Sequence, residues 1–246
     1  MIDYHDLADH LSLYPFPITQ NHLQRLADTL SLSSQVRLLD LSCGKGELLC
    51  QWAQKYELKG LGVDNDEEKI KLARERATEL EVWSEAHFVS DTVSDFPQEF
   101  HEYDVVLSLG GAYHWPDHLS ALKSMQEALT DAHAGMLVLG DFFWKQEPDP
   151  QTCQKFNLDP SELNTLTHLT QNFHEAGLLV MNIIIADQVD WDEYYSQQWL
   201  GMMRWLHRHP ETNYDPIIKT MMESQRKYLE YERELISWGI FVLTRP

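Results

Sequence analysis

The chain has 246 residues, 43% of them hydrophobic and 11% aromatic, enough to bury the core of one domain with an appendage. Its net charge of −20 argues against nucleic acid as a partner, because phosphate backbones are bound mainly by lysine and arginine. The three cysteines form no C-x-x-C pair, and no apolar run reaches the length of a membrane span, so we expect a cytoplasmic protein without a zinc cluster or a membrane anchor.

Two helices are predicted before the first strand, over residues 4–13 and 19–30, with a break at Pro15 and Pro17 between them. The first would carry His5 and His10, but a spacing of five does not bring two ligands to one helix face. No metal site is therefore expected there.

The next segment is predicted to be a strand, a glycine turn and a helix. An apolar strand over residues 36–41 runs into Gly44 and Gly46, and a helix is expected over residues 47–56. The free N–H groups of such a helix point into the turn and favour an anionic or polar ligand. A second strand, residues 60–63, precedes Asp64, an acid at the distance from the turn that suits a ribose-binding carboxylate.

Strands and helices then alternate, which predicts a parallel sheet with crossover helices. Asn65 is expected to cap the next helix, which would end near Leu80, with Glu68 completing the start. The further predicted elements are a strand at 87–90 before Asp91, a strand at 103–109, a helix at 116–129 and a strand at 136–140.

The last hundred residues are less regular. They predict a proline-rich connection over 145–160, a helix over 161–176, a strand over 179–185 and a final strand over 238–244. Between those strands, residues 186–236 appear as a helical, aromatic insertion that suits either a lid or an ordinary packed hairpin.

The residues around the glycine turn distinguish among nucleotide ligands. Leu49 stands where a dinucleotide-binding turn has its third small residue, and no Gly-Lys-Ser/Thr follows as in a P-loop. Asp40 followed by Cys43, Gly44 and Gly46 resembles motif I of the class I S-adenosylmethionine-dependent methyltransferases, acid-x-G-x-G-x-G, with Ser42 in place of the first glycine.

This resemblance implies an α/β fold, a Rossmann-like seven-stranded methyltransferase sheet with helices on both faces, in which the last strand lies antiparallel between strands five and six. It implies one methyltransferase domain over 1–246, with an N-terminal helical cover over 1–34 and a helical insertion over 186–236. S-adenosylmethionine would be the cofactor and S-adenosylhomocysteine the product. The implied cofactor-binding residues are Asp40, Ser42, Cys43, Gly44, Gly46, Asp64, Asn65, Asp91, Thr92, Leu109 and Tyr14.

Residues for the reaction itself are expected after the fourth strand, at Tyr113, His114 and Trp115. His114 is the candidate base, because imidazole titrates near neutrality; it also suits a loop histidine that only packs. Later segments resemble a bacterial subgroup of these enzymes and imply an acceptor pocket. Its candidate residues are Phe16, Trp144, Trp191, Tyr195, Trp199, Arg204 and Trp238. Arg204 suits pairing with one of the many surface acids better than pairing with an acidic acceptor.

The sequence therefore predicts methyl transfer to a small-molecule acceptor by in-line displacement at the sulfonium methyl. Two other classes stay open: a non-catalytic S-adenosylmethionine binder that acts as a sensor or interaction protein, and an NAD-dependent oxidoreductase, which Leu49 disfavours. No oligomeric state is predicted.

Overall fold

The computed structural model describes residues 14–96, 102–130 and 135–246, so the helix predicted over residues 4–13 lies outside the described residues. The chain divides into two compact units. The first, here the sheet unit, comprises Gln20–Asp141, Thr167–Ile184 and Gly239–Pro246. The second, the helical unit, comprises the described part of Met1–Thr19 together with Phe142–Leu166 and Ile185–Trp238.

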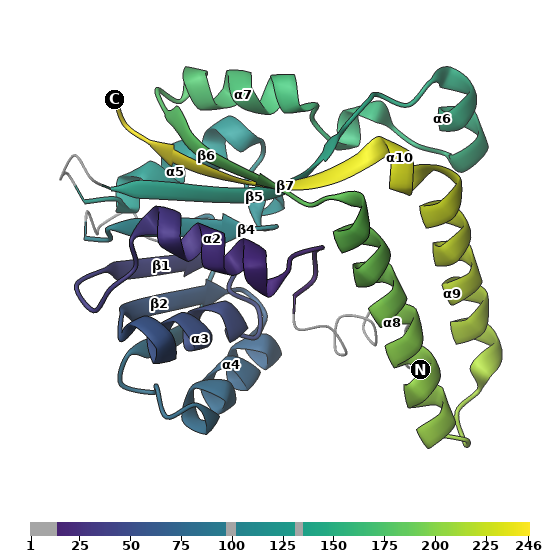
Figure 1. Cartoon of the computed structure of the whole chain (residues 1–246), viewed down its shortest axis with the longest axis horizontal. Helices are drawn as coiled ribbons and strands as arrows, with labels where there is room; N and C mark the ends of the chain where they lie inside the picture. The colour runs from purple at the N-terminus through teal and green to yellow at the C-terminus, as the bar shows by residue number, and fades with distance from the viewer. Residues whose placement is uncertain (1–13, 97–101, 131–134) are drawn as a thin grey trace. The chain divides into compact units, whose positions relative to one another are not determined.

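The seven strands form one mixed sheet in the order β3-β2-β1-β4-β5-β7-β6, with β7 antiparallel, which confirms the predicted architecture (Figure 1). The strands are β1 (Arg37–Leu41), β2 (Lys59–Asp64), β3 (Ala86–Ser90), β4 (Val105–Leu109), β5 (Met136–Trp144), β6 (Leu179–Ile185) and β7 (Ile236–Thr244). The order reverses at β1, where Asp40 is in register with Gly62 of β2 and with Leu107 of β4. Open α/β sheets bind ligands at such a reversal, beyond the carboxyl ends of the strands.

Helices alternate with these strands and cover the sheet (Figure 1). They are α2 (Gln20–Leu30), α3 (Glu47–Tyr56), α4 (Glu67–Glu79), α5 (His118–Ala128) and α7 (Leu166–Glu175). The four residues Leu38–Leu41 of β1 are all buried, as expected for a strand with helices on both faces of its sheet.

Three local predictions need correction. The cap of α4 is Asp66 and not Asn65, because the Asp66 carboxylate accepts the N–H groups of Glu68 and Lys69 at 3.0 and 3.2 Å. Strand β5 continues four residues past Gly140 to Trp144, whose N–H donates to Asn164 O at 2.9 Å. The proline-rich connection contains a short helix, α6 (Pro150–Phe156), whose first residue is a proline and whose cap is Asp149.

The helical unit is dominated by a hairpin of two helices, α8 (Gln188–Arg208) and α9 (Tyr214–Lys227), which run side by side (Figure 1). The hairpin has its own apolar core of Met202, Leu206, Ile217 and Met221. A π-helical turn, Tyr228–Glu232, and the short α10 (Arg233–Leu235) follow before β7 begins. The insertion predicted over residues 186–236 is therefore helical.

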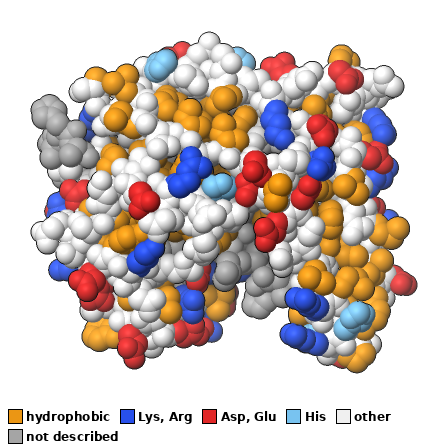
Figure 2. All heavy atoms as spheres, in the orientation of Figure 1, with side chains coloured by type: hydrophobic (Ala, Val, Ile, Leu, Met, Phe, Trp, Pro, Cys, Tyr) orange, Lys and Arg blue, Asp and Glu red, His pale blue; other side chains and the backbone are white. Residues whose placement is uncertain are grey.

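Acidic side chains are spread over the face seen in Figure 2 and alternate there with lysine and arginine. Hydrophobic side chains also reach the surface along α9 (Figure 2). Met222 of α9 and Leu229 of the π-helical turn that follows it are exposed. Of the helices that the structure describes, none combines the length and the apolar character needed to span a bilayer.

Candidate functional site

The turn between β1 and α3 is held in an unusual backbone conformation. Ser42, Gly44 and Gly46 have φ of +68°, +55° and +70°, the left-handed region in which glycine is favoured. A Cβ on Gly46 would lie 2.5 Å from the Phe88 ring, so this position accepts only glycine. A Cβ on Gly44 would meet no atom within 4 Å, so this stretch of backbone borders open space that a ligand can occupy.

Asp64, the last residue of β2, is buried and oriented by two backbone groups. Its Oδ2 accepts the Gly44 N–H at 2.9 Å, and its Oδ1 accepts the Asp66 N–H at 3.0 Å. Each oxygen retains a second lone pair, so the carboxylate can accept two further hydrogen bonds side by side. This arrangement fits a vicinal diol.

Asp91 and Thr92 follow β3 at the same edge. The Asp91 N–H donates to Asp64 O at 3.1 Å, and the Asp91 carboxylate accepts the Thr92 N–H at 2.7 Å. Both side chains are exposed, unlike that of Asp64. They are therefore free to meet the outer end of a ligand that begins at the glycine turn.

Asp40 lies fully inside the sheet unit. Burial, and then the charge of Asp64, raises the pKa of its carboxyl group to about 8, so Asp40 keeps its proton at neutral pH. Burial and the same two acids also raise the pKa of the Cys43 thiol well above its ordinary value, which makes this cysteine a packing residue and not a thiolate nucleophile.

The segment after Leu109, the last residue of β4, brings aromatic and imidazole groups to this edge in a short helical turn, η1 (Ala112–His114). His114 is half-buried, and its Nε2 has no hydrogen-bond partner among the described residues. Burial lowers the pKa of His114, while the charge of Asp64 acts in the opposite direction. Trp115 is buried with its indole N–H unpartnered within the described ranges, and Tyr113 is exposed.

A histidine–aspartate pair that was not predicted joins α5 to the neighbouring strand β5. His118 Nε2 and Asp141 Oδ2 are 2.7 Å apart, and both side chains are largely buried. Asp141 follows Gly140, which pairs with Leu109 at the end of β4, and an acid after this apolar run was the signal available in the sequence. Its pairing with the first residue of α5 depends on the fold.

Six of the residues predicted in the N-terminal stretch and the late segments gather within the helical unit. Ring centroids are 6.1 Å apart for Tyr14 and Phe16, and 4.6 Å for Phe16 and Trp238. Phe142, which was not predicted, contacts both Trp238 and Trp191, at 5.5 and 6.0 Å. The contacts continue from Trp191 to Tyr195 at 6.1 Å and on to Trp199 at 5.6 Å. We call this set the aromatic cluster: Tyr14, Phe16, Phe142, Trp191, Tyr195, Trp199 and Trp238.

Two predicted acceptor residues do not join the aromatic cluster. Trp144 donates its indole N–H to Pro160 O at 2.9 Å, a contact that fixes the end of β5. Arg204 is exposed on α8.

Comparison with known proteins identifies the class to which this site belongs. The family model described as "Methyltransferase domain" matches residues 32–215. An uncharacterized protein of Escherichia coli, YjhP, is 28% identical over 232 residues, which is 92% of each chain. A SAM-dependent methyltransferase from Geobacter sulfurreducens, solved in complex with S-adenosyl-L-homocysteine, superposes with a TM-score of 0.87 at 26% identity and covers 100% of this chain and 99% of that one. The 27-O-demethylrifamycin SV methyltransferase of Amycolatopsis mediterranei is 27% identical over 159 residues, 63% of this chain and 58% of the relative.

Proposed function

Because the chain belongs to the class I S-adenosylmethionine-dependent methyltransferases, we propose that it transfers the methyl group of this cofactor to a small-molecule acceptor. The name of the Amycolatopsis relative, which describes a methyltransferase acting on a small natural product, supports this acceptor class. The strongly negative charge of the chain agrees with it, since a nucleic-acid acceptor calls for a basic surface.

The observation that carries the proposal is the anchored carboxylate of Asp64. Two backbone N–H groups fix its orientation and leave one lone pair on each oxygen, so it would accept both ribose hydroxyls of the cofactor. The open backbone at Gly44 admits the ligand, and the exposed Asp91 and Thr92 would meet the adenine. The turn from Ser42 to Gly46, with Asp40 beneath it, would hold the amino acid portion.

When bound, S-adenosylmethionine supplies a methyl group that an acceptor lone pair can displace from the sulfonium in line. The protein then needs to position the acceptor, exclude water and remove a proton where the nucleophile carries one. We assign proton removal to His114, since its Nε2 has no partner among the described residues and its lowered pKa keeps the ring neutral at physiological pH. Tyr113 and Trp115 flank His114 and would contact the acceptor.

The acceptor-binding residues that we propose are those of the aromatic cluster. Trp191, Trp199 and Trp238 contribute large apolar surfaces, and their indole N–H groups have no hydrogen-bond partner among the described residues. Buried donors of this kind are usually satisfied in a folded protein, by protein, water or ligand. A ligand that combines apolar surface with hydrogen-bond acceptors would satisfy them.

Two measurements test the proposal. Isothermal titration calorimetry with S-adenosylmethionine, S-adenosylhomocysteine and NAD should show binding of the first two alone; binding of NAD alone would contradict the assignment. A screen of metabolite extracts with methyl-labelled cofactor should then give labelled small products. Tight cofactor binding with no labelled product from any extract would favour the non-catalytic sensor.

A further inference from the structure

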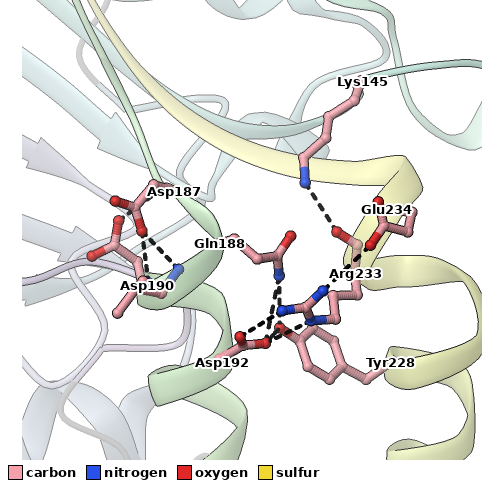
Figure 3. Close-up of polar contacts among 9 residues, drawn as sticks. Lys145, Asp187, Gln188, Asp190, Asp192, Tyr228, Arg233 and Glu234 are labelled. Atoms are coloured by element: carbon pink, nitrogen blue, oxygen red, sulfur yellow. Dashed lines mark hydrogen bonds and ion pairs between the residues drawn. The ribbon is translucent and has the colours of Figure 1, made fainter.

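Two carboxylates of the helical unit, Asp192 on α8 and Glu232 on the π-helical turn, differ in the groups that pair with them. Asp192 on α8 forms a two-point ion pair with Arg233, with Nε to Oδ1 at 2.9 Å and an Nη to Oδ2 at 2.8 Å (Figure 3). The Tyr228 hydroxyl also donates to Asp192, at 2.6 Å. This carboxylate is therefore fully compensated, and accordingly its pKa is lowered, to about 2.

Glu232, one residue before Arg233, has no such cation. Its two oxygens accept the hydroxyls of Tyr195, at 2.7 Å, and Tyr231, at 3.2 Å. All lysines and arginines lie within the described residues, and none of them forms an ion pair with Glu232. The adjacent Arg233 is directed to Asp192 and Glu234 (Figure 3).

An anion without an ion pair is costly in this position. Glu232 is partly buried, and burial raises the pKa of its carboxyl group, although the two tyrosine hydroxyls and the charge of Lys227, which forms no ion pair with it, act against that rise. Neutral hydroxyls satisfy the hydrogen-bonding capacity of a carboxylate but not its charge. A cation from outside the chain would complete this site as Arg233 completes Asp192.

The surroundings of Glu232 suit an organic cation. Tyr195, which donates to Glu232, lies at the centre of the rings: its centroid is 4.1 Å from that of Tyr228, 5.6 Å from Trp199 and 6.1 Å from Trp191. Aromatic faces attract ammonium groups, most strongly where water is excluded. The turn that carries Glu232 is π-helical, a rare form that occurs frequently at functional sites.

We propose that Glu232, with Tyr195 and the rings around it, binds the cationic amine of the methyl acceptor. The inference rests on the proposed function, because the amine would be a group that the methyl acceptor carries. Where this nitrogen is itself the methylated atom, it must first lose a proton to present a lone pair to the sulfonium methyl. It narrows the small-molecule class to positively charged nitrogen compounds.

Choline and its uncharged carbon isostere, 3,3-dimethylbutan-1-ol, provide a matched pair of probes that differ in charge. Calorimetric titration of the protein saturated with S-adenosylhomocysteine should show choline binding about tenfold or more tightly than the alcohol. Glu232→Gln, which keeps the shape and removes the charge, should abolish this preference. Glu230→Gln serves as the control, since it removes an exposed charge two residues away that pairs with Lys155.

Equal affinity of the wild-type protein for the two probes would overturn the inference, as would a preference that persists in Glu232→Gln. The wild-type comparison needs no variant, so a folding defect in Glu232→Gln leaves the test intact. Binding of S-adenosylhomocysteine is measured in the same titrations. Cofactor binding without a preference for choline refutes the amine site alone, whereas failure of the wild-type protein to bind the cofactor refutes the proposed function.

Discussion

Asp40→Asn tests the electrostatics of the glycine turn through folding stability. In the native protein burial and Asp64 raise the pKa of Asp40 to about 8, against 3.8 for an ordinary aspartate. The native state therefore holds a proton that the unfolded chain releases near pH 4. The stability from this group is fully present below pH 4 and is lost as pH rises towards 8, at about 1.4 kcal/mol per pH unit.

The difference between the two pKa values corresponds to about 6 kcal/mol over the whole range, and to about 3 kcal/mol between pH 6 and pH 8. Asparagine resembles the protonated acid and does not titrate. The free energy of unfolding of Asp40→Asn minus that of the wild-type protein should therefore increase by these amounts as pH rises, and should level off above pH 8.

Urea unfolding followed by tryptophan fluorescence at pH 5, 6, 7, 8 and 9 measures this difference, in which the other carboxylates cancel. Repeating the comparison in an Asp64→Asn background tests how far the charge of Asp64 raises the pKa of Asp40. Without that charge the pKa of Asp40 falls, so the stability difference between the two proteins levels off at a lower pH. Parallel pH profiles for the wild-type protein and Asp40→Asn would show that Asp40 is ionised in the native state and would refute the reasoning.

Three other substitutions have defined expectations. Asp64→Asn removes the charged acceptor proposed for the two ribose hydroxyls and should raise the Kd for S-adenosylhomocysteine about a hundredfold or more, so an unchanged Kd in calorimetry would contradict the placement of the ribose. Once an acceptor is known, His114→Ala should lower kcat by about 10²-fold or more without changing the Kd for the cofactor. In the wild-type protein, the activity should fall on the acidic side with an apparent pKa below 6.5, because burial lowers the pKa of His114. A normal rate and pH profile in the variant would show that His114 is not the base. Arg76→Met leaves Glu47 without its ion pair, of N to O 2.7 Å, and should cost about 2 kcal/mol at pH 7, because Arg76 is one-third exposed. Burial raises the pKa of the Glu47 carboxyl group, but hydrogen bonds from Arg76 and Gln51 lower it overall, so the stability that the ion pair provides is lost on acidification below about pH 4.5. Equal urea midpoints for the wild-type protein and Arg76→Met at pH 7 would show that the ion pair does not stabilise the fold.

The sequence predicted the sheet well because its strands are short apolar runs. For β2, β3 and β4 the boundary is also marked by Asp64, Asp91 and Gly110, at the strand end or directly after it. Strand β6 was placed correctly at both ends, and β1 and β3 within one residue. The predicted element boundaries were wrong where one residue type is common both in loops and at helix starts. Pro150 looked like a loop signal but starts α6, since the first turn of a helix tolerates proline.

Contacts between distant segments were beyond the reach of local patterns. His118 and Asp141 are 23 residues apart, and Tyr195 and Glu232 are 37 apart. Each side chain alone resembles an ordinary surface or packing residue. The compensation of Asp192 by Arg233, and its absence at Glu232, likewise becomes visible only when α8 and the π-helical turn are placed side by side.

The two departures from a glycine-rich turn have the same structural explanation. Leu49, where a dinucleotide-binding turn has a small residue, packs on Gly60 of β2, and a Cβ on Gly60 would overlap the Leu49 side chain. Ser42 replaces the first glycine of the methyltransferase motif, and its hydroxyl occupies the space that a Cβ on Gly111 would fill. In both cases a glycine on the facing segment provides the room that the turn itself has lost. The close packing is thus kept because the glycine stands on the facing segment, at Gly60 or Gly111, instead of in the turn. A glycine motif in this fold therefore has to be compared together with the segments that pack against it.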